Sequence, residues 1–353
     1  MGAVQQVYVH IGPHKTGTTY LQNILWRNRS ALAETGISVP GDEWPAQRRS
    51  VAKLVQRPPG VRARPAPKRR SPRDAWDRLL AEVDASGAHT VLLSVERLCT
   101  AESHAVEALV QSFAPSRVDV VYTGRDLARV IPGAWQTRIR NRAAPTWREY
   151  LASVRCPGDA HTDGGRFWRQ QDPAQSLPAW LDHVPSDRVH VVTTPPAGSP
   201  PQLLWERFCD VVGLEPDHYD LDVPRSNVSL GGVEAEVLRR LSARVAQRLP
   251  LSAYVDLVNH FVAREVLEQR EQSFRLVLPE TEHAWLAPRA EAAVGYLRRG
   301  GFRVVGDLGD LVPVPEAGAR LPDDVSAGEV VQLLDEVLGA TLLEIDRRQQ
   351  ASR

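Results

Sequence analysis

Cysteine is scarce in this sequence. The 353 residues contain three cysteines, Cys99, Cys156 and Cys209, which lie far apart in the chain. An odd number of widely separated cysteines indicates neither a disulfide framework nor a metal site with clustered thiol ligands. This usage fits a reducing compartment, where disulfides are rare.

Long hydrophobic runs are also absent. No stretch of about 18 uninterrupted apolar residues occurs, so no membrane span is expected. The first residues lack the charged region and the following apolar segment of a secretory signal. Since 42% of the residues are hydrophobic, the chain can still bury a sizeable core. We therefore expect a soluble protein of the cytoplasm.

The chain has no net charge, but its charges are unevenly distributed. From Arg48 to Arg73 there are ten Lys or Arg residues and no acid, which leaves 33 basic against 43 acidic residues elsewhere. Several prolines interrupt this stretch, so residues 46–73 are predicted to form a basic, mobile insertion. The stretch lacks the aromatic residues that single-strand binders use for stacking. A solvated loop is therefore favoured over a nucleic-acid or membrane patch, and no nucleic-acid partner is expected.

Strand and helix patterns alternate along the first two thirds of the chain. Runs of apolar and β-branched residues predict strands at 7–11, 90–96, 117–125 and 186–194. Strands separated by helices indicate an α/β fold with a parallel sheet flanked by helices. Residues 230–353 carry mostly helical patterns, and we predict that they are the helical portion of one domain over 1–353. In such sheets, ligands bind beyond the carboxyl ends of the strands.

Shorter segments within this pattern also predict local structure. The segment "DAWDRLLAEVDASG" has a helix start signal at Asp74 and a stop signal at Gly87. The segment "ISVPG" predicts a short extended piece, and "FRVVGDLGDLVP" predicts a short strand and a turn.

The segment "VYVHIGPHKTGTTYLQ" joins the first predicted strand to a helix. Gly12 and Gly17 permit tight turns and a close approach of backbone to a ligand, and Thr18 or Thr19 can cap the helix. Backbone N–H groups at a helix start attract anions, and Lys15 adds a positive charge. The loop therefore predicts a phosphate site; the plain alternative is a strand, turn and helix with a solvated lysine.

The spacing of this loop differs from a Walker A motif. Gly12 and Gly17 have the separation of G-x-x-x-x-G-K-[ST], but Thr18 stands where the lysine belongs, and Lys15 precedes the second glycine. The segment "PHKTGTTYLQ" instead resembles the 5′-phosphosulfate-binding loop of the sulfotransferases, bacterial members included. These enzymes use 3′-phosphoadenosine 5′-phosphosulfate (PAPS).

The resemblance assigns roles to the loop residues. Lys15 would contact the bridging oxygen between the phosphate and the sulfuryl group. The residues expected to cradle the 5′-phosphate are Thr16, Gly17, Thr18 and Thr19. His14 is expected in the same donor-binding set; as a residue beside Lys15 it could also act as an acid or base, or point to solvent.

Two further positions at strand ends extend the resemblance. Glu96 follows the apolar residues "TVLL" of the segment 90–96 and resembles the acid that relatives place there as a candidate general base. Arg125 follows the next strand, "VVYTGR", and resembles the arginine that holds the 3′-phosphate of PAPS. The alternatives are structural ion pairs, for example between Glu96 and Arg97.

The sequence departs from the family pattern after this arginine. The family usually has a serine seven or eight residues later, whereas this chain has Pro132 and Gly133. The segment "PRSNVSLGG" offers a substitute, in which Arg225 and Ser226 would reach a phosphate or the ribose. The alternative is an ordinary helix start with Ser229 as the N-cap.

The resemblance as a whole implies a PAPS-dependent sulfotransferase in which Lys15 and Glu96 are catalytic. The acceptor would be a hydroxyl or amine of a carbohydrate, glycolipid or small natural product, and no metal is expected. One alternative is a catalytically silent nucleotide-binding relative. A nucleotide or small-molecule kinase is another, against which the position of Lys15 argues.

Overall fold

The structure is a computed structural model that describes residues 4–43, 45–56, 74–223, 229–316 and 320–351. The chain forms two compact units. The first consists of Met1–Leu127, Trp168–Ser226 and Ala287–Val312. The second consists of Ala128–Phe167, Asn227–Leu286 and Pro313–Arg353. That residues 1–353 make a single domain stays a prediction.

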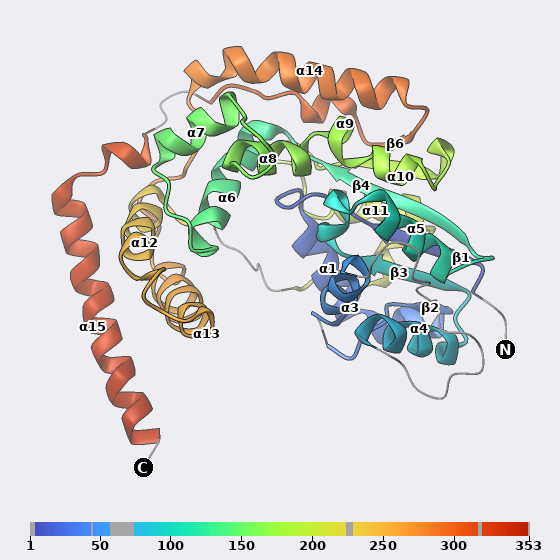
Figure 1. Cartoon of the computed structure of the whole chain (residues 1–353), viewed down its shortest axis with the longest axis horizontal. Helices are drawn as coiled ribbons and strands as arrows, with labels where there is room; N and C mark the ends of the chain where they lie inside the picture. The colour runs from blue at the N-terminus through green and yellow to red at the C-terminus, as the bar shows by residue number, and fades with distance from the viewer. Residues whose placement is uncertain (1–3, 44, 57–73, 224–228, 317–319, 352–353) are drawn as a thin grey trace. The chain divides into compact units, whose positions relative to one another are not determined.

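The described part of the first unit contains a six-stranded sheet with the order β2-β3-β1-β4-β5-β6 (Figure 1). The strands are β1 Gln6–His10, β2 Ile37–Ser38, β3 Thr90–Ser94, β4 Arg117–Gly124, β5 Val189–Thr193 and β6 Arg303–Val305. Every neighbouring pair is parallel. The predicted α/β class with a parallel sheet is confirmed, and so are the short strands at 37–38 and 303–305.

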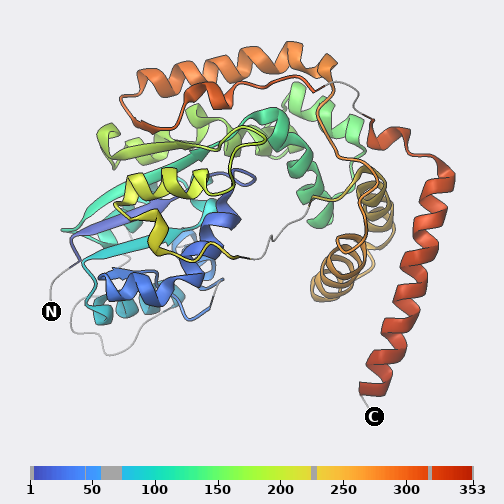
Figure 2. The ribbon, with the colours of Figure 1, turned by 180° about the vertical axis from the view of Figure 1, so that it is seen from behind.

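Helices cover both faces of this sheet (Figures 1 and 2). The helices that lie wholly in the first unit are α1 Thr18–Arg27, α2 Arg29–Glu34, α3 Ala46–Val55, α4 Ala75–Ser86, α5 Ser103–Ser112, α9 Pro173–Ser176, α10 Pro178–Leu181 and α11 Leu203–Val212. Because successive side chains of a strand point to opposite faces, Val7 and Val9 pack into one apolar cluster and Tyr8 into the other. The first cluster includes residues of α3, α4 and α5, and the second includes residues of α1, α2 and α11.

The predicted boundaries of α4 are confirmed. The Asp74 carboxylate accepts hydrogen bonds from the backbone N–H groups of Trp76 (2.9 Å) and Asp77 (3.2 Å), which are otherwise unpaired at a helix start. Gly87 ends the helix with a φ of 67°, a conformation that glycine adopts without steric cost.

The structure differs from the prediction at residues 46–55, which form α3 and not a mobile insertion. Val51 and Leu54 are fully buried in the cluster that also contains Trp76 of α4. The sequence suggested a solvated stretch because arginine and lysine are dense in it. In the structure these charged residues lie on the exposed side of the helix, opposite the apolar face. The rest of the predicted basic insertion, residues 57–73, lies outside the described residues.

The second unit is predominantly helical, as predicted for the C-terminal third. Its principal helices are α6 Leu127–Arg140, whose first residue belongs to the first unit, α7 Trp147–Arg155, α12 Gly232–Val245, α13 Leu251–Tyr254, the π-helix η4 Val255–Leu267 and α15 Ala327–Ala351. Two further helices, α8 Asp163–Gln171 and α14 His283–Arg299, begin in this unit and continue into the first. The N-cap of α12 is Gly231, so Ser229 does not cap this helix.

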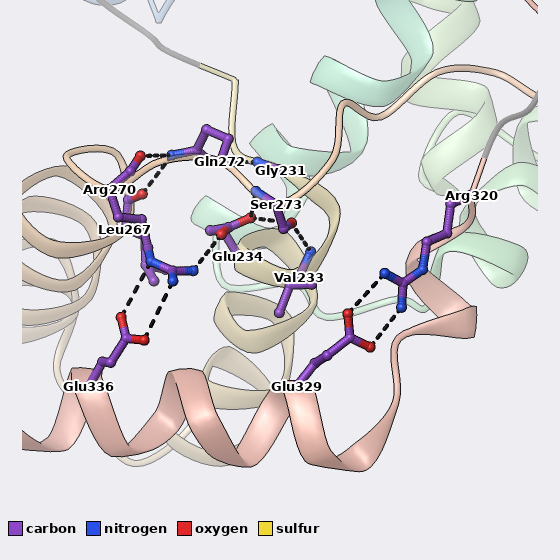
Figure 3. A network of polar contacts seen from close by, with 10 residues as sticks. All are labelled: Gly231, Val233, Glu234, Leu267, Arg270, Gln272, Ser273, Arg320, Glu329 and Glu336. Carbon is purple, nitrogen blue, oxygen red and sulfur yellow. Dashed lines mark hydrogen bonds and ion pairs between the residues drawn. The ribbon is translucent and has the colours of Figure 1, made fainter.

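A polar network links α12 to other parts of the second unit (Figure 3). The fully buried Glu234 carboxylate accepts hydrogen bonds from Arg270 Nη1 (2.6 Å) and Ser273 Oγ (2.7 Å). Arg270 also forms an ion pair with Glu336 of α15, with Nε and Oε2 3.4 Å apart. A buried charge needs such partners, since an unpaired one is strongly destabilising. We therefore assign this network to the stability of the second unit.

Two further findings concern the hydropathy of the helices and the state of the cysteines. Within the described ranges, no helix combines the length and the hydropathy needed to cross a membrane. All three cysteines are free, and Cys99 and Cys209 are buried.

Candidate functional site

The candidate site lies at the carboxyl edge of the sheet in the first unit. The loop at 11–17 follows β1, Ser94 ends β3, Arg125 follows β4 and Thr194 follows β5. These four strands are adjacent and parallel, so their carboxyl ends lie along one edge. The sequence predicted that the Lys15 loop, Glu96 and Arg125 lie at strand ends, and the contacts below connect them.

The backbone of the loop adopts two left-handed conformations, at Lys15 (φ 73°) and Gly17 (φ 88°). Few residues other than glycine adopt a positive φ, and such strained positions cluster at functional sites. Gly12 is required for a different reason, because a β-carbon there would lie 1.8 Å from Thr123 Oγ1. The loop therefore packs directly against the end of β4.

Thr16 holds the loop against the ends of β4 and β5. Its side chain is fully buried, and its hydroxyl donates to the carbonyl of Pro13 (2.7 Å) and lies 2.6 Å from Thr123 Oγ1. The carbonyl of Thr16 accepts a hydrogen bond from Thr194 Oγ1 at 2.8 Å. Thr16 was expected to help cradle a phosphate, but its hydroxyl is bonded within the protein. The backbone N–H of Thr16 is left as the group that could donate to a ligand.

Two further side chains hold the loop through its carbonyl groups. Arg125 Nη1 donates to the carbonyl of Lys15 at 3.0 Å, and Gln171 Nε2 donates to the carbonyl of His14 at 2.9 Å. Arg125 also lines a pocket whose other lining residues are Tyr122, Gly124, Leu127, Gln171, Pro173, Ala290, Ala293, Leu297 and Leu311. The predicted phosphate-binding arginine thus contacts the loop directly.

The Glu96 side chain contacts the first residue of α1. Glu96 is the first residue of the short 3₁₀-helix η1 Glu96–Thr100, and its Oε1 accepts a hydrogen bond from Thr18 Oγ1 at 2.9 Å. The prediction that Thr18 or Thr19 caps α1 was wrong. The N-cap is Gly17, with no side-chain cap, and the Thr18 hydroxyl is turned to Glu96. Glu96 forms no ion pair with any described basic residue, so the alternative of a structural pair with Arg97 is not found.

His10 connects the strand ends beneath the loop. The side chain is buried, with Nδ1 2.7 Å from Ser94 Oγ and Nε2 3.3 Å from Thr123 Oγ1. Burial lowers the pKa of His10 to about 4, and the charge of Glu96 opposes this only in part. The ring is therefore neutral at pH 7. In the sequence His10 stands out only as a polar residue in an apolar strand.

The loop is electrostatically positive. The pKa of His14 is lowered chiefly by burial; Glu96 raises it, while Lys15, Arg48 and Arg97 lower it. At neutral pH His14 is accordingly uncharged, surrounded by three cations and one carboxylate. Such a set of charges favours an anionic ligand.

A pocket opens beside Glu96, and we call it the Glu96 pocket. Residues from α1, α3 and the end of β3 line it: Gln22, Leu25, Trp26, Val39, Gln47, Arg48, Ser94 and Glu96. Gln47 and Arg48 lie on α3, in the stretch that the sequence suggested was a loop. The sequence carried no signal for their position, because α3 is brought to this edge only by packing.

The remaining predicted residues have other positions. Arg225 and Ser226 lie outside the described residues. Pro132 and Gly133, which stand where the family has a serine, lie in α6 and belong to the second unit. Among the residues that the structure describes, no group of three or more His, Cys, Asp and Glu could hold a metal ion.

A comparison with solved structures found the crystal structure of a sulfotransferase from Alicyclobacillus acidocaldarius. The two chains are 16% identical with a TM-score of 0.38, over 72% of this chain and 99% of the other. No protein-family model and no curated protein matches the sequence. Both the identity and the TM-score are low, so the assignment of a function depends on the residues of the site itself.

Proposed function

We propose that the protein is a sulfotransferase that moves a sulfuryl group from PAPS to a hydroxyl or amine of a small molecule or glycan. The observation that carries the proposal is the convergence of three groups. Arg125 donates to the carbonyl of Lys15, and Thr18, at the end of the same loop, donates to Glu96. One loop thus connects three residues. In this proposal Lys15 is the cation for the leaving phosphate, Arg125 binds the second phosphate and Glu96 is the base.

The loop residues suit the 5′-phosphosulfate of the donor. The first N–H groups of a helix have no partner within the helix, and α1 has no side-chain cap. These N–H groups, the helix dipole and the surrounding cations favour a dianionic phosphate. Lys15 and the backbone of Thr16, Gly17, Thr18 and Thr19 would hold the 5′ end, and Arg125 would hold the 3′-phosphate.

The proposed reaction is an in-line displacement at sulfur. The acceptor oxygen or nitrogen forms a bond to sulfur while the bond from sulfur to the phosphate oxygen breaks. The electron pair of that bond leaves on adenosine 3′,5′-bisphosphate, and the proton of the acceptor passes to Glu96. Lys15 stabilises the charge that develops on the leaving phosphate, a contribution that grows toward the transition state.

Calorimetric titration with three nucleotides tests the donor assignment. Adenosine 3′,5′-bisphosphate should bind more tightly than adenosine 5′-monophosphate and than ATP, and Arg125→Ala should reduce the first preference. Equal binding of the bisphosphate and the monophosphate would refute the 3′-phosphate site, and tighter binding of ATP would favour a kinase. A silent nucleotide-binding protein would show the bisphosphate preference without sulfate transfer to any member of an acceptor panel.

A further inference from the structure

The Glu96 pocket has a rigid polar wall. Gln47 is buried, and its Oε1 accepts from the backbone N–H of Ser94 at 2.8 Å while its Nε2 donates to the carbonyl of Pro40 at 3.0 Å. On the other side, Gln22 Nε2 donates to the carbonyl of Ser94 at 3.1 Å. These bonds fix the chain just before Glu96, so the carboxylate is presented from a preorganised turn.

Two polar groups of the pocket are left for a ligand. Gln22 Oε1 is buried and has no hydrogen-bond partner among the described residues. Arg48 pairs with no described carboxylate, although Glu96 lines the same pocket. The neighbouring Arg49 behaves differently, because its Nη2 lies 2.6 Å from Glu43 Oε1. Buried polar atoms and exposed cations at a pocket are satisfied when a complementary ligand binds.

The rest of the lining is apolar. Leu25, Trp26 and Val39 supply aliphatic and aromatic surface to the same pocket. Small-molecule sites commonly combine such a wall with a few polar groups that fix the orientation of the ligand. The occupant that matches these parts has an apolar body, a hydroxyl group that donates its single proton to Glu96, and an anionic group for Arg48.

We propose that the acceptor is a hydroxylated organic acid with an apolar or aromatic body, and that Arg48 is the residue that selects its carboxylate. This inference rests on the proposed function, since it names the acceptor of the same site. The charge of Arg48 offsets the repulsion between an anionic acceptor and Glu96, so the acceptor hydroxyl can approach the carboxylate that takes its proton.

Binding of a matched pair of probes tests the inference. The probes are 3-(4-hydroxyphenyl)propionate and its neutral primary amide, titrated with and without saturating adenosine 3′,5′-bisphosphate. The wild type should bind the acid at least about tenfold more tightly than the amide, as expected for a charge-assisted hydrogen bond. Arg48→Gln should abolish the difference, Arg48→Lys should restore part of it, and the control Arg49→Gln should retain it.

Each other outcome has a defined meaning. Equal binding of acid and amide by the wild type overturns the inference, and so does an equal loss in Arg48→Gln and Arg49→Gln. If Arg48→Gln weakens the bisphosphate and keeps the acid preference, Arg48 contacts the donor and the inference is wrong. If the wild type prefers the acid but does not bind the bisphosphate, the selectivity of the pocket stands and the proposed function fails. Arg48 is exposed, so its substitution should leave the melting temperature nearly unchanged.

Discussion

The buried His10 should make the stability of the protein depend on pH. Its pKa is lowered from 6.5 to about 4 in the folded chain because burial disfavours the charged ring. The unfolded state therefore takes up a proton first as the pH falls. The free energy of unfolding is fully retained above pH 6.5, declines between pH 6.5 and about 4, and levels off below that range.

The size of this effect follows from the difference in pKa. A difference of 2.5 units, at 1.36 kcal/mol for each unit, is worth roughly 3 kcal/mol over the whole range. Between pH 7.5 and pH 5 the loss attributable to His10 is roughly 2 kcal/mol. That is a large fraction of the 5–15 kcal/mol that typically separates a folded domain from its unfolded chain.

Urea unfolding of wild type and His10→Asn at pH 7.5, 6.5, 5.5 and 5.0 measures this difference. Asparagine retains a donor and acceptor near Ser94 but loses the contact with Thr123, so the variant should be less stable at pH 7.5 by about 1 kcal/mol. Its stability should then fall less with acid than that of the wild type, so the two curves converge. The exposed His218 gives the control, since His218→Asn should follow the wild type at every pH. Parallel curves for wild type and His10→Asn would refute the reasoning.

Three further substitutions have definite expected outcomes. Lys15→Ala should lower kcat by on the order of 10²–10³ in a sulfate-transfer assay while it weakens bisphosphate binding much less; near-normal turnover would refute the catalytic assignment. Gly12→Ala should destabilise the protein by about 1–3 kcal/mol in urea unfolding, because its β-carbon would lie 1.8 Å from a threonine hydroxyl, whereas Gly339→Ala, with open space around it, should not destabilise. Burial alone would raise the pKa of Asp119, but hydrogen bonds from His190, Arg117 and Gln6 outweigh it and the pKa lies below its usual range. This carboxylate therefore stabilises the fold above about pH 4, and Asp119→Asn should cost roughly 3–5 kcal/mol at pH 7 and reduce the further loss of stability below pH 4; an unchanged acid-unfolding curve would contradict this.

Local sequence signals accounted for much of the fold. Asp74 and Gly87 marked the ends of α4 because an N-cap carboxylate and a left-handed C-cap act within a few residues. Apolar and β-branched runs marked the strands, and their separation by helices required parallel pairing. The loop around Lys15 was also recognisable, since its glycines, hydroxyl groups and lysine are contiguous in the chain.

The same local reasoning was wrong for α3. The density of arginine, lysine and proline after residue 46 suggested a solvated stretch, but Val51 and Leu54 lie three residues apart and share one buried face. Only the presence of α4 and the sheet decides whether such a short apolar face is buried. Since α3 carries Gln47 and Arg48, the composition of the Glu96 pocket was hidden by the same misreading.

The sequence by itself determined where the glycine-bounded loop around Lys15, the parallel strands and the helices would form, because these depend on residues that are neighbours in the chain. The tertiary structure alone decided the chemistry of individual side chains. His10 meets Ser94 and Thr123 across separations of 84 and 113 residues, and Thr18 turns away from its helix to Glu96 across 78 residues. Contacts at such separations exist only when the sheet brings its strand ends together, and burial then determines which groups keep a charge.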